Sequence, residues 1–264
     1  MLSAANLVFR AGRRVLIDHI SADFEPARLH LIIGPNGAGK STFVRLLARL
    51  IRPAEGQVLY DGQDVAHRSQ RELAQRRAVL SQAVEVAFSL PVRELVLMGR
   101  YPHFTARPGA GDEQVCDEVM QFFDVAGMAD RSYGTLSGGE KQRVQFARVL
   151  AQIWRPLDGA ARFLFLDEPL TFLDIRHQID FMEKIRKFAS QKDAIVVGVV
   201  HDLNLAAQFA DRLLLLHDGR VLADGTTRSV LREEHLGTAF GVVPVLLTNP
   251  ATGRTHLAFE DSSA

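Results

Sequence analysis

The stretch from residue 31 to residue 42, "LIIGPNGAGKST", decides the fold of this chain. It contains the pattern G-x-x-x-x-G-K-[ST], between an apolar run suited to a buried strand and a helical segment, "STFVRLLARLI", at 41–51. Glycines let a backbone wrap around a phosphate group, and the N–H groups at a helix start supply hydrogen-bond donors. We interpret the stretch as a phosphate-binding loop, called the phosphate loop, made of Gly34, Pro35, Asn36, Gly37, Ala38, Gly39, Lys40, Ser41 and Thr42.

Two side chains of this loop have expected roles. Lys40 should reach the β- and γ-phosphates of a nucleotide, and the Ser41 hydroxyl should hold Mg²⁺. An ordinary glycine turn between a strand and a helix is the simpler alternative. The complete pattern, in the strand–loop–helix setting that it requires, favours the phosphate loop.

The segments on either side indicate an α/β fold with a mostly parallel sheet, because short apolar runs alternate with helical patterns. Near-continuous hydrophobic runs at 29–33, 162–166 and 194–200 are typical of strands covered on both faces. Between residues 91 and 151 helical periodicity replaces the strand signal. We expect one domain over 1–264, with an N-terminal antiparallel β part, an inserted helical subdomain at roughly 88–152 and a C-terminal hairpin at roughly 242–260. The predicted strands are 15–24, 29–33, 57–60, 78–82, 162–166, 194–200 and 212–217.

Composition narrows the classes of function. The 264 residues are 47% hydrophobic, enough for a substantial core, and 31 basic side chains balance 31 acidic ones. That balance argues against a general nucleic-acid-binding protein. Cys116 is the single cysteine, so the sequence has no disulfide framework and no cysteine metal cluster. With no signal peptide and no apolar run near 20 residues, we expect a soluble intracellular protein that reaches a membrane only through another protein.

An acidic strand end, "FLFLDEP" at 163–169, is the second candidate site. Ligand sites of α/β sheets lie at the carboxyl ends of their strands. Asp167 fits the carboxylate that organises Mg²⁺, and Glu168 is placed to act as a general base on water. A plain strand-end cap is the alternative for this segment taken alone.

A second glycine-containing loop, "TLSGGEKQR" at 135–143, starts another helix. Ser137 and Glu140 have the spacing of a capping box, which accounts for the helix. It does not account for the adjacent Gly138 and Gly139, which leave bare backbone at the positive end of that helix.

With "GPNGAGKST", "LSGGEKQR", "FLFLDEP" and "VVHDLN" (199–204) in this order, the chain resembles the nucleotide-binding subunits of ATP-binding-cassette (ABC) transporters over nearly its whole length. The resemblance implies ATP and Mg²⁺ as ligands and a head-to-tail homodimer. In that family the LSGGE loop of one copy caps the γ-phosphate on the phosphate loop of the other. That gives Ser137, Gly138, Gly139 and Glu140 a role at the partner's nucleotide.

The resemblance also assigns single residues. Gln82 resembles the Q-loop glutamine that contacts Mg²⁺, and His201 resembles the switch histidine that senses the γ-phosphate. Asp174 resembles the D-loop aspartate at the dimer interface, although Thr171 and Phe172 stand where the family usually has Ser-Ala. The other eight histidines are interpreted as ordinary surface or core residues.

The position of the family's adenine-stacking aromatic falls on Arg10, with Phe9 beside it. Arg10 could stack through its planar guanidinium, or Phe9 could take its place. Both remain open on the sequence.

The cargo is suggested by resemblance alone. "VRELVLMGRYPH" at 92–103 resembles importers of ferric siderophores, haem and cobalamin, although a packed helix explains the same pattern. The insertion Trp154–Ala161, "TFLDIRHQ" and the segment at 201–225 look most like haem importers. This implies two membrane-spanning permease subunits, a periplasmic substrate-binding protein, no nucleic acid, and a peripheral position on the cytoplasmic face of the bacterial inner membrane. A siderophore or cobalamin importer stays open, and so does a soluble non-transport ABC ATPase.

Overall fold

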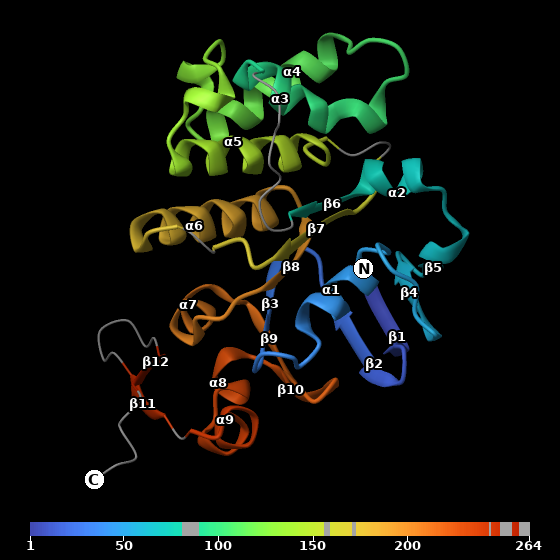
Figure 1. Cartoon of the computed structure of the whole chain (residues 1–264), viewed down its shortest axis with the longest axis vertical. Helices are drawn as coiled ribbons and strands as arrows, with labels where there is room; N and C mark the ends of the chain where they lie inside the picture. Colours follow the sequence, from blue (N-terminus) through green and yellow to red (C-terminus); the bar gives the residue numbers. More distant parts are fainter. Residues whose placement is uncertain (81–89, 156–158, 171–172, 243, 249–254, 259–264) are drawn as a thin grey trace.

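The computed structural model describes residues 1–80, 90–155, 159–170, 173–242, 244–248 and 255–258. Its centre is a six-stranded sheet in the order β10-β9-β3-β8-β7-β6, and all neighbours are parallel except β9 and β10 (Figure 1). The α/β fold class with a mostly parallel sheet is confirmed. The strands are β3 (Arg28–Ile33), β6 (Arg77–Leu80), β7 (Arg162–Asp167), β8 (Ala194–Val199), β9 (Arg212–His217) and β10 (Arg220–Gly225).

A four-stranded antiparallel sheet in the order β2-β1-β4-β5 forms the N-terminal β part. Its strands are β1 (Leu2–Ala11), β2 (Arg14–Phe24), β4 (Glu55–Tyr60) and β5 (Gln63–Asp64). Neither β1 nor β10 is among the individually predicted strands. The "DG" pairs at 61–62 and 218–219 make the turns after β4 and β9, where Asp61 and Asp218 adopt left-handed backbone conformations.

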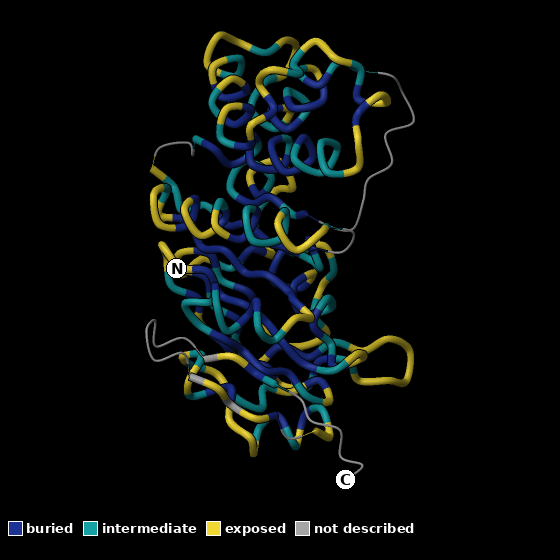
Figure 2. The backbone as a smooth tube through the Cα atoms, turned by 90° about the vertical axis from the view of Figure 1, so that its left-hand side faces the viewer, coloured by how far each residue is buried: buried dark blue, intermediate teal, exposed yellow. Residues whose placement is uncertain are grey.

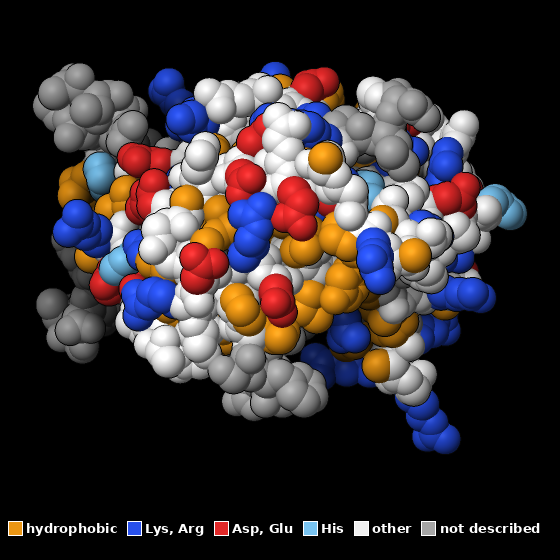
Figure 3. All heavy atoms as spheres, turned by 90° about the horizontal axis from the view of Figure 1, so that it is seen from above, with side chains coloured by type: hydrophobic (Ala, Val, Ile, Leu, Met, Phe, Trp, Pro, Cys, Tyr) orange, Lys and Arg blue, Asp and Glu red, His pale blue; other side chains and the backbone are white. Residues whose placement is uncertain are grey.

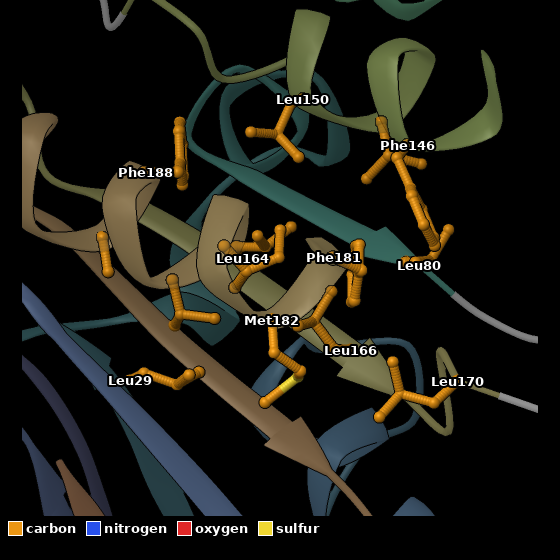
Figure 4. Close-up of a cluster of buried hydrophobic side chains, with 14 of the residues drawn as sticks. Leu29, Leu80, Phe146, Leu150, Leu164, Leu166, Leu170, Phe181, Met182 and Phe188 are labelled. Carbon is orange, nitrogen blue, oxygen red and sulfur yellow. The ribbon is translucent and has the colours of Figure 1, made fainter. Parts of the chain in front are cut away.

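The parallel sheet is buried on both faces (Figure 2). Phe163 and Phe165 point into a core shared with α1 (Lys40–Leu47) and the antiparallel sheet. Leu164 and Leu166, which alternate with them, point toward α6 (Ile175–Gln191) and the helical segments beyond it (Figure 4). Alternating side chains of one strand therefore serve two separate cores, which explains the continuous hydrophobic run.

Residues 91–151 consist of helices joined by loops and lie beyond α6 at the top of Figure 1. The main helices here are α3 (Val92–Leu97), α4 (Ala110–Phe122) and α5 (Gly138–Ala151). Short 3-10 turns lie at Met98–His103, Ala126–Met128 and Tyr133–Thr135. Trp154, just past α5, joins this block to the core: its indole donates to Glu118 of α4 at 2.7 Å and stacks on Phe188 of α6.

The remaining elements surround the sheet. A 3-10 turn at Val65–His67 and α2 (Gln70–Arg76) precede β6, while α7 (Leu203–Phe209) follows β8. The C-terminal part holds α8 (Thr227–Val230), α9 (Glu233–Phe240) and the antiparallel pair β11 (Val245–Thr248) and β12 (Thr255–Ala258). Among the helices described, none combines the length and the apolar character that crossing a membrane requires.

Candidate active site

Three candidate segments meet at one edge of the parallel sheet. The phosphate loop follows β3, Asp167 ends β7, and His201 comes two residues after β8, which lies between those strands. Their carboxyl ends share an edge because the three strands are parallel and adjacent. The sheet order therefore brings together residues that are far apart in the sequence.

The phosphate loop is closely held by the rest of the chain, and two of its glycines have no room for a side chain. Gly34 and Gly39 both have positive φ, at 148° and 98°. A Cβ on Gly34 would lie 2.2 Å from the Leu216 carbonyl oxygen, and one on Gly39 would lie 2.6 Å from that of Leu16. Glycine is required at both positions for backbone conformation and for space.

Lys40 lies inside this loop. It is 5% exposed, and its Nζ donates to the carbonyl oxygens of Gly34 at 2.8 Å and Pro35 at 2.9 Å. Burial lowers the pKa of the Lys40 ammonium, while the carboxylates of Glu168 and Asp167 oppose that shift. Main-chain oxygens therefore hold the Lys40 ammonium inside the loop, where it also feels the charges of two carboxylates. A phosphate bound by this loop would lie close to it.

The acidic strand end carries two carboxylates in different settings. Asp167 has a buried Oδ1 that accepts no hydrogen bond from the residues described. Glu168 follows with a φ of 53°, a left-handed conformation that is costly for a residue with a side chain. Its Oε1 lies 2.8 Å from Nε2 of His201. The two neighbouring carboxylates therefore have different surroundings: Glu168 contacts His201, and the Asp167 Oδ1 is buried without a donor from the described residues.

The residues present fit a bound Mg²⁺. Ser41 is half-buried in the first turn of α1, and Asp167 supplies a carboxylate oxygen without a protein donor. Oxygen donors of these types are those that Mg²⁺ prefers, together with phosphate oxygens. Gln82, the third predicted ligand, lies outside the described residues.

The LSGGE loop, Ser137–Glu140, has the predicted capping box. The Ser137 N–H and hydroxyl each donate to Glu140 Oε2 at 2.8 Å, and the Glu140 N–H donates back to the Ser137 hydroxyl at 3.4 Å. These donors lower the pKa of the Glu140 carboxyl, the Ser137 N–H having the largest effect.

Gly138 of that loop is open, unlike Gly34 and Gly39 of the phosphate loop. A Cβ on Gly138 would meet nothing within 4 Å. Among the described residues, no hydrogen bond or ion pair links this loop to residues 34–42. Within one chain the two glycine loops are separate features.

Asp174 caps the N-terminus of α6, accepting from the His177 N–H at 2.9 Å and contacting the His177 Nδ1 at 2.7 Å. Both contacts lower the pKa of the Asp174 carboxyl. The same imidazole lies beside the LSGGE loop, with Nε2 3.7 Å from the place of a Cβ on Gly139. Sequence reasoning treated His177 as an ordinary histidine, and no spacing rule would have paired it with Gly139.

The sequence analysis did not predict two other contacts near the candidate site. Gln142 of α5 donates to the carbonyl of Pro169, just past Glu168, at 2.8 Å, which ties the helix of the LSGGE loop to the acidic strand end. Exposed Arg14 places Nη2 4.0 Å from where a Cβ of Gly37 would be. The pair "RR" at 13–14 was the available signal for a cation at the mouth of the phosphate loop.

The adenine candidates differ in availability. Phe9 is half-buried and packs against the core below the phosphate loop. Arg10 is exposed and lies 3.6 Å from Glu55, a weak surface ion pair. Arg10 is therefore the freer of the two side chains.

Comparison with known proteins identifies relatives. The family model described as "ABC transporter" matches residues 17–171. A protein of Gloeobacter violaceus named "Hemin import ATP-binding protein HmuV" is 46% identical over 253 residues, covering 96% of this chain and 92% of the relative. A protein of the same name in Escherichia coli O157:H7 is 40% identical, covering 95% of this chain and 96% of its own length.

Two solved structures have the same fold. A chain of a metal-chelate type ABC transporter in an inward-facing conformation has a TM-score of 0.82 and 25% identity, covering 99% of this chain and 98% of its own. A dimeric bacterial ABC transporter cassette has a TM-score of 0.72 and 25% identity, covering 86% of this chain and 99% of its own.

Proposed function

We propose that this chain, which belongs to the ABC transporter family, hydrolyses ATP to drive the import of haem. The single observation that carries the chemistry is the meeting of Lys40, Asp167 and the Glu168–His201 pair at one edge of the sheet. The assignment of haem as the cargo rests on the likeness of this chain, over nearly its whole length, to proteins named for hemin import.

In the proposed reaction the phosphate loop binds the triphosphate of ATP. Main-chain N–H groups and the start of α1 supply donors, and Lys40 exchanges its two carbonyl partners for phosphate oxygens. Ser41 and Asp167 would hold Mg²⁺, with Gln82 as a further ligand. Bound Mg²⁺ would neutralise charge that develops on the phosphate oxygens.

Glu168 would accept the proton of the attacking water. It is close enough to His201 for a hydrogen bond, and the imidazole can both orient the carboxylate and donate to the γ-phosphate. The left-handed turn at Glu168 separates the base from Asp167 although the two are neighbours in the chain.

A homodimer would complete each site. Gly138 and Gly139 of the LSGGE loop lie at the start of α5, with its partial positive charge, and the chain's own phosphate loop does not contact them. Ile175, next to Asp174, is 73% exposed, which suits burial against a second copy. A cassette of similar fold is a dimer.

The proposed location is the cytoplasmic face of the bacterial inner membrane, with two permease subunits as partners and a periplasmic protein delivering the cargo. Figure 3 looks onto the end that carries the helical block, where hydrophobic side chains surface among acidic and basic ones. Tyr101, in the turn after α3, is 57% exposed and contacts Phe104 edge to face. An exposed tyrosine beside a half-buried phenylalanine suits docking onto a partner protein.

A reconstituted complex of this chain, its permease and its binding protein would test the function. We expect Mg²⁺-dependent ATPase activity that haem-loaded binding protein stimulates. If binding protein loaded with a ferric siderophore or cobalamin stimulates the activity instead, the assignment of haem as cargo is wrong and the assignment as a transport ATPase stands. If the chain hydrolyses ATP but copurifies with no membrane-spanning partner, the soluble non-transport ATPase becomes the better conclusion.

A further inference from the structure

The C-terminal hairpin contacts the helix that follows His201. Asn204, in the first turn of α7, pairs its side-chain amide with both main-chain polar groups of Leu257 on β12. Asn204 Nδ2 donates to the Leu257 carbonyl at 3.1 Å, and the Leu257 N–H donates to Asn204 Oδ1 at 2.8 Å. The Leu257 side chain is 5% exposed and joins the core with Leu205 and Phe209.

This contact matters because α7 is too short to be stable without tertiary contacts. It has seven residues, and isolated helices of that length are unstable in water. Its position therefore depends on tertiary contacts. An amide that satisfies one donor and one acceptor of a neighbouring strand fixes both the distance and the rotation of the helix start.

The same residue is linked to the active site. The Asn204 N–H donates to Oδ1 of Asp202, the N-cap of α7, at 2.7 Å. Asp202 follows His201 directly, and the His201 Nε2 lies 2.8 Å from Glu168. Hydrogen bonds and one peptide link thus run without a gap from the hairpin to the proposed base.

We propose that Asn204 is a positioning residue for ATP hydrolysis: held by the hairpin strand at Leu257, it fixes the start of α7 and with it the His201 imidazole against Glu168. Asn204 would not touch the nucleotide. The inference rests on the proposed ATPase function.

The test measures steady-state ATPase kinetics of the full chain with Asn204→Ala. We expect kcat to fall about 5- to 10-fold, the scale of a lost coupling between neighbouring residues, with KM for ATP unchanged because the phosphate loop is intact. Asn204→Asp keeps the acceptor for the Leu257 N–H but loses the donor, so its kcat should be intermediate. Gln208→Ala is the matched control, since Gln208 lies one turn along α7 and its side chain makes no hydrogen bond to the described residues; its kcat should match wild type.

A double-variant comparison separates positioning from a general loss of structure. In a His201→Ala background, Asn204→Ala should change kcat by less than about 2-fold, because the group that it positions is gone. Equal losses with and without His201 would overturn the proposal, as would unchanged kcat in Asn204→Ala. Should Asn204→Ala fail to fold, Asn204→Asp carries the same test. A wild-type chain without any ATPase activity would refute the proposed function itself, a distinguishable result.

Discussion

The phosphate loop and the LSGGE loop both place glycines before a helix, yet they are opposite in construction. The phosphate loop is enclosed: Gly34 and Gly39 press against main-chain carbonyls, and Lys40 is buried among its own loop's oxygens. The LSGGE loop is closed only on itself, through the Ser137–Glu140 box, while Gly138 faces open space. The contacts that enclose the phosphate loop all come from its own chain. In the LSGGE loop, Gly138 has no neighbour within reach of a Cβ, and Gly139 lies beside the His177 imidazole.

The largest effect should come from the enclosed loop. Lys40→Ala removes the buried cation and should abolish ATP hydrolysis, a loss of about 10³-fold or more, and weaken nucleotide binding. Lys187→Ala, which removes an exposed lysine of α6, is the control and should leave both unchanged. Near-normal turnover by Lys40→Ala would contradict the proposed role of the phosphate loop in ATP hydrolysis.

Glu168→Gln separates binding from chemistry. The amide keeps the size of the side chain but cannot take a proton, so hydrolysis should fall about 10²-fold or more while ATP still binds. An intact γ-phosphate would then keep joining the phosphate loop to a partner's LSGGE loop. Size-exclusion chromatography with ATP and Mg²⁺ should show an accumulated dimer for the variant and a monomer for wild type. Hydrolysis near the wild-type rate would mean that Glu168 is not the base.

Mixing two inactive variants tests whether the open loop serves a second chain. Ser137→Arg should block hydrolysis and leave ATP binding on its own phosphate loop intact. An equal mixture with Lys40→Ala should regain up to about one quarter of wild-type activity, since half of the dimers are mixed and each has one intact site of two. A mixture that stays inactive although the chains demonstrably dimerise would contradict shared sites.

A pair of glycine substitutions gives the smallest effects and the sharpest contrast. Gly39→Ala forces a Cβ to within 2.6 Å of a carbonyl at a φ of 98°, so it should lower the free energy of unfolding by about 1–3 kcal/mol. Gly138→Ala places its Cβ in open space and should change the free energy of unfolding by less than about 0.5 kcal/mol. Denaturant unfolding measures both. Equal destabilisation would remove the structural distinction between the loops.

The sequence predicted the parts of the site that depend on neighbouring residues. The phosphate loop, the capping box of Ser137 and Glu140, and the acids after a buried strand are short patterns whose local physics is nearly independent of the rest of the chain. A strand is found at each of the seven predicted places, apart from the strand ends and from residues 81–82, which lie outside the described residues. The continuous apolar runs at 29–33, 162–166 and 194–200 are the strands buried on both faces. β1 escaped individual prediction because its irregular pairing with β2 breaks the alternation of buried and exposed side chains.

Only the tertiary structure decided which of these parts meet. His201 reaches Glu168 because β8 and β7 are adjacent and parallel, and no local pattern contains that order. The neighbours His177 and Gly139, and the pair Asn204 and Leu257, arise in the same way, from segments separated by tens of residues. Local sequence fixes the conformation of a loop or a helix start, whereas contacts across the fold depend on how every element packs. The sequence by itself therefore predicted a phosphate-binding loop, and the packing of the sheet and helices determined which side chains lie beside that loop.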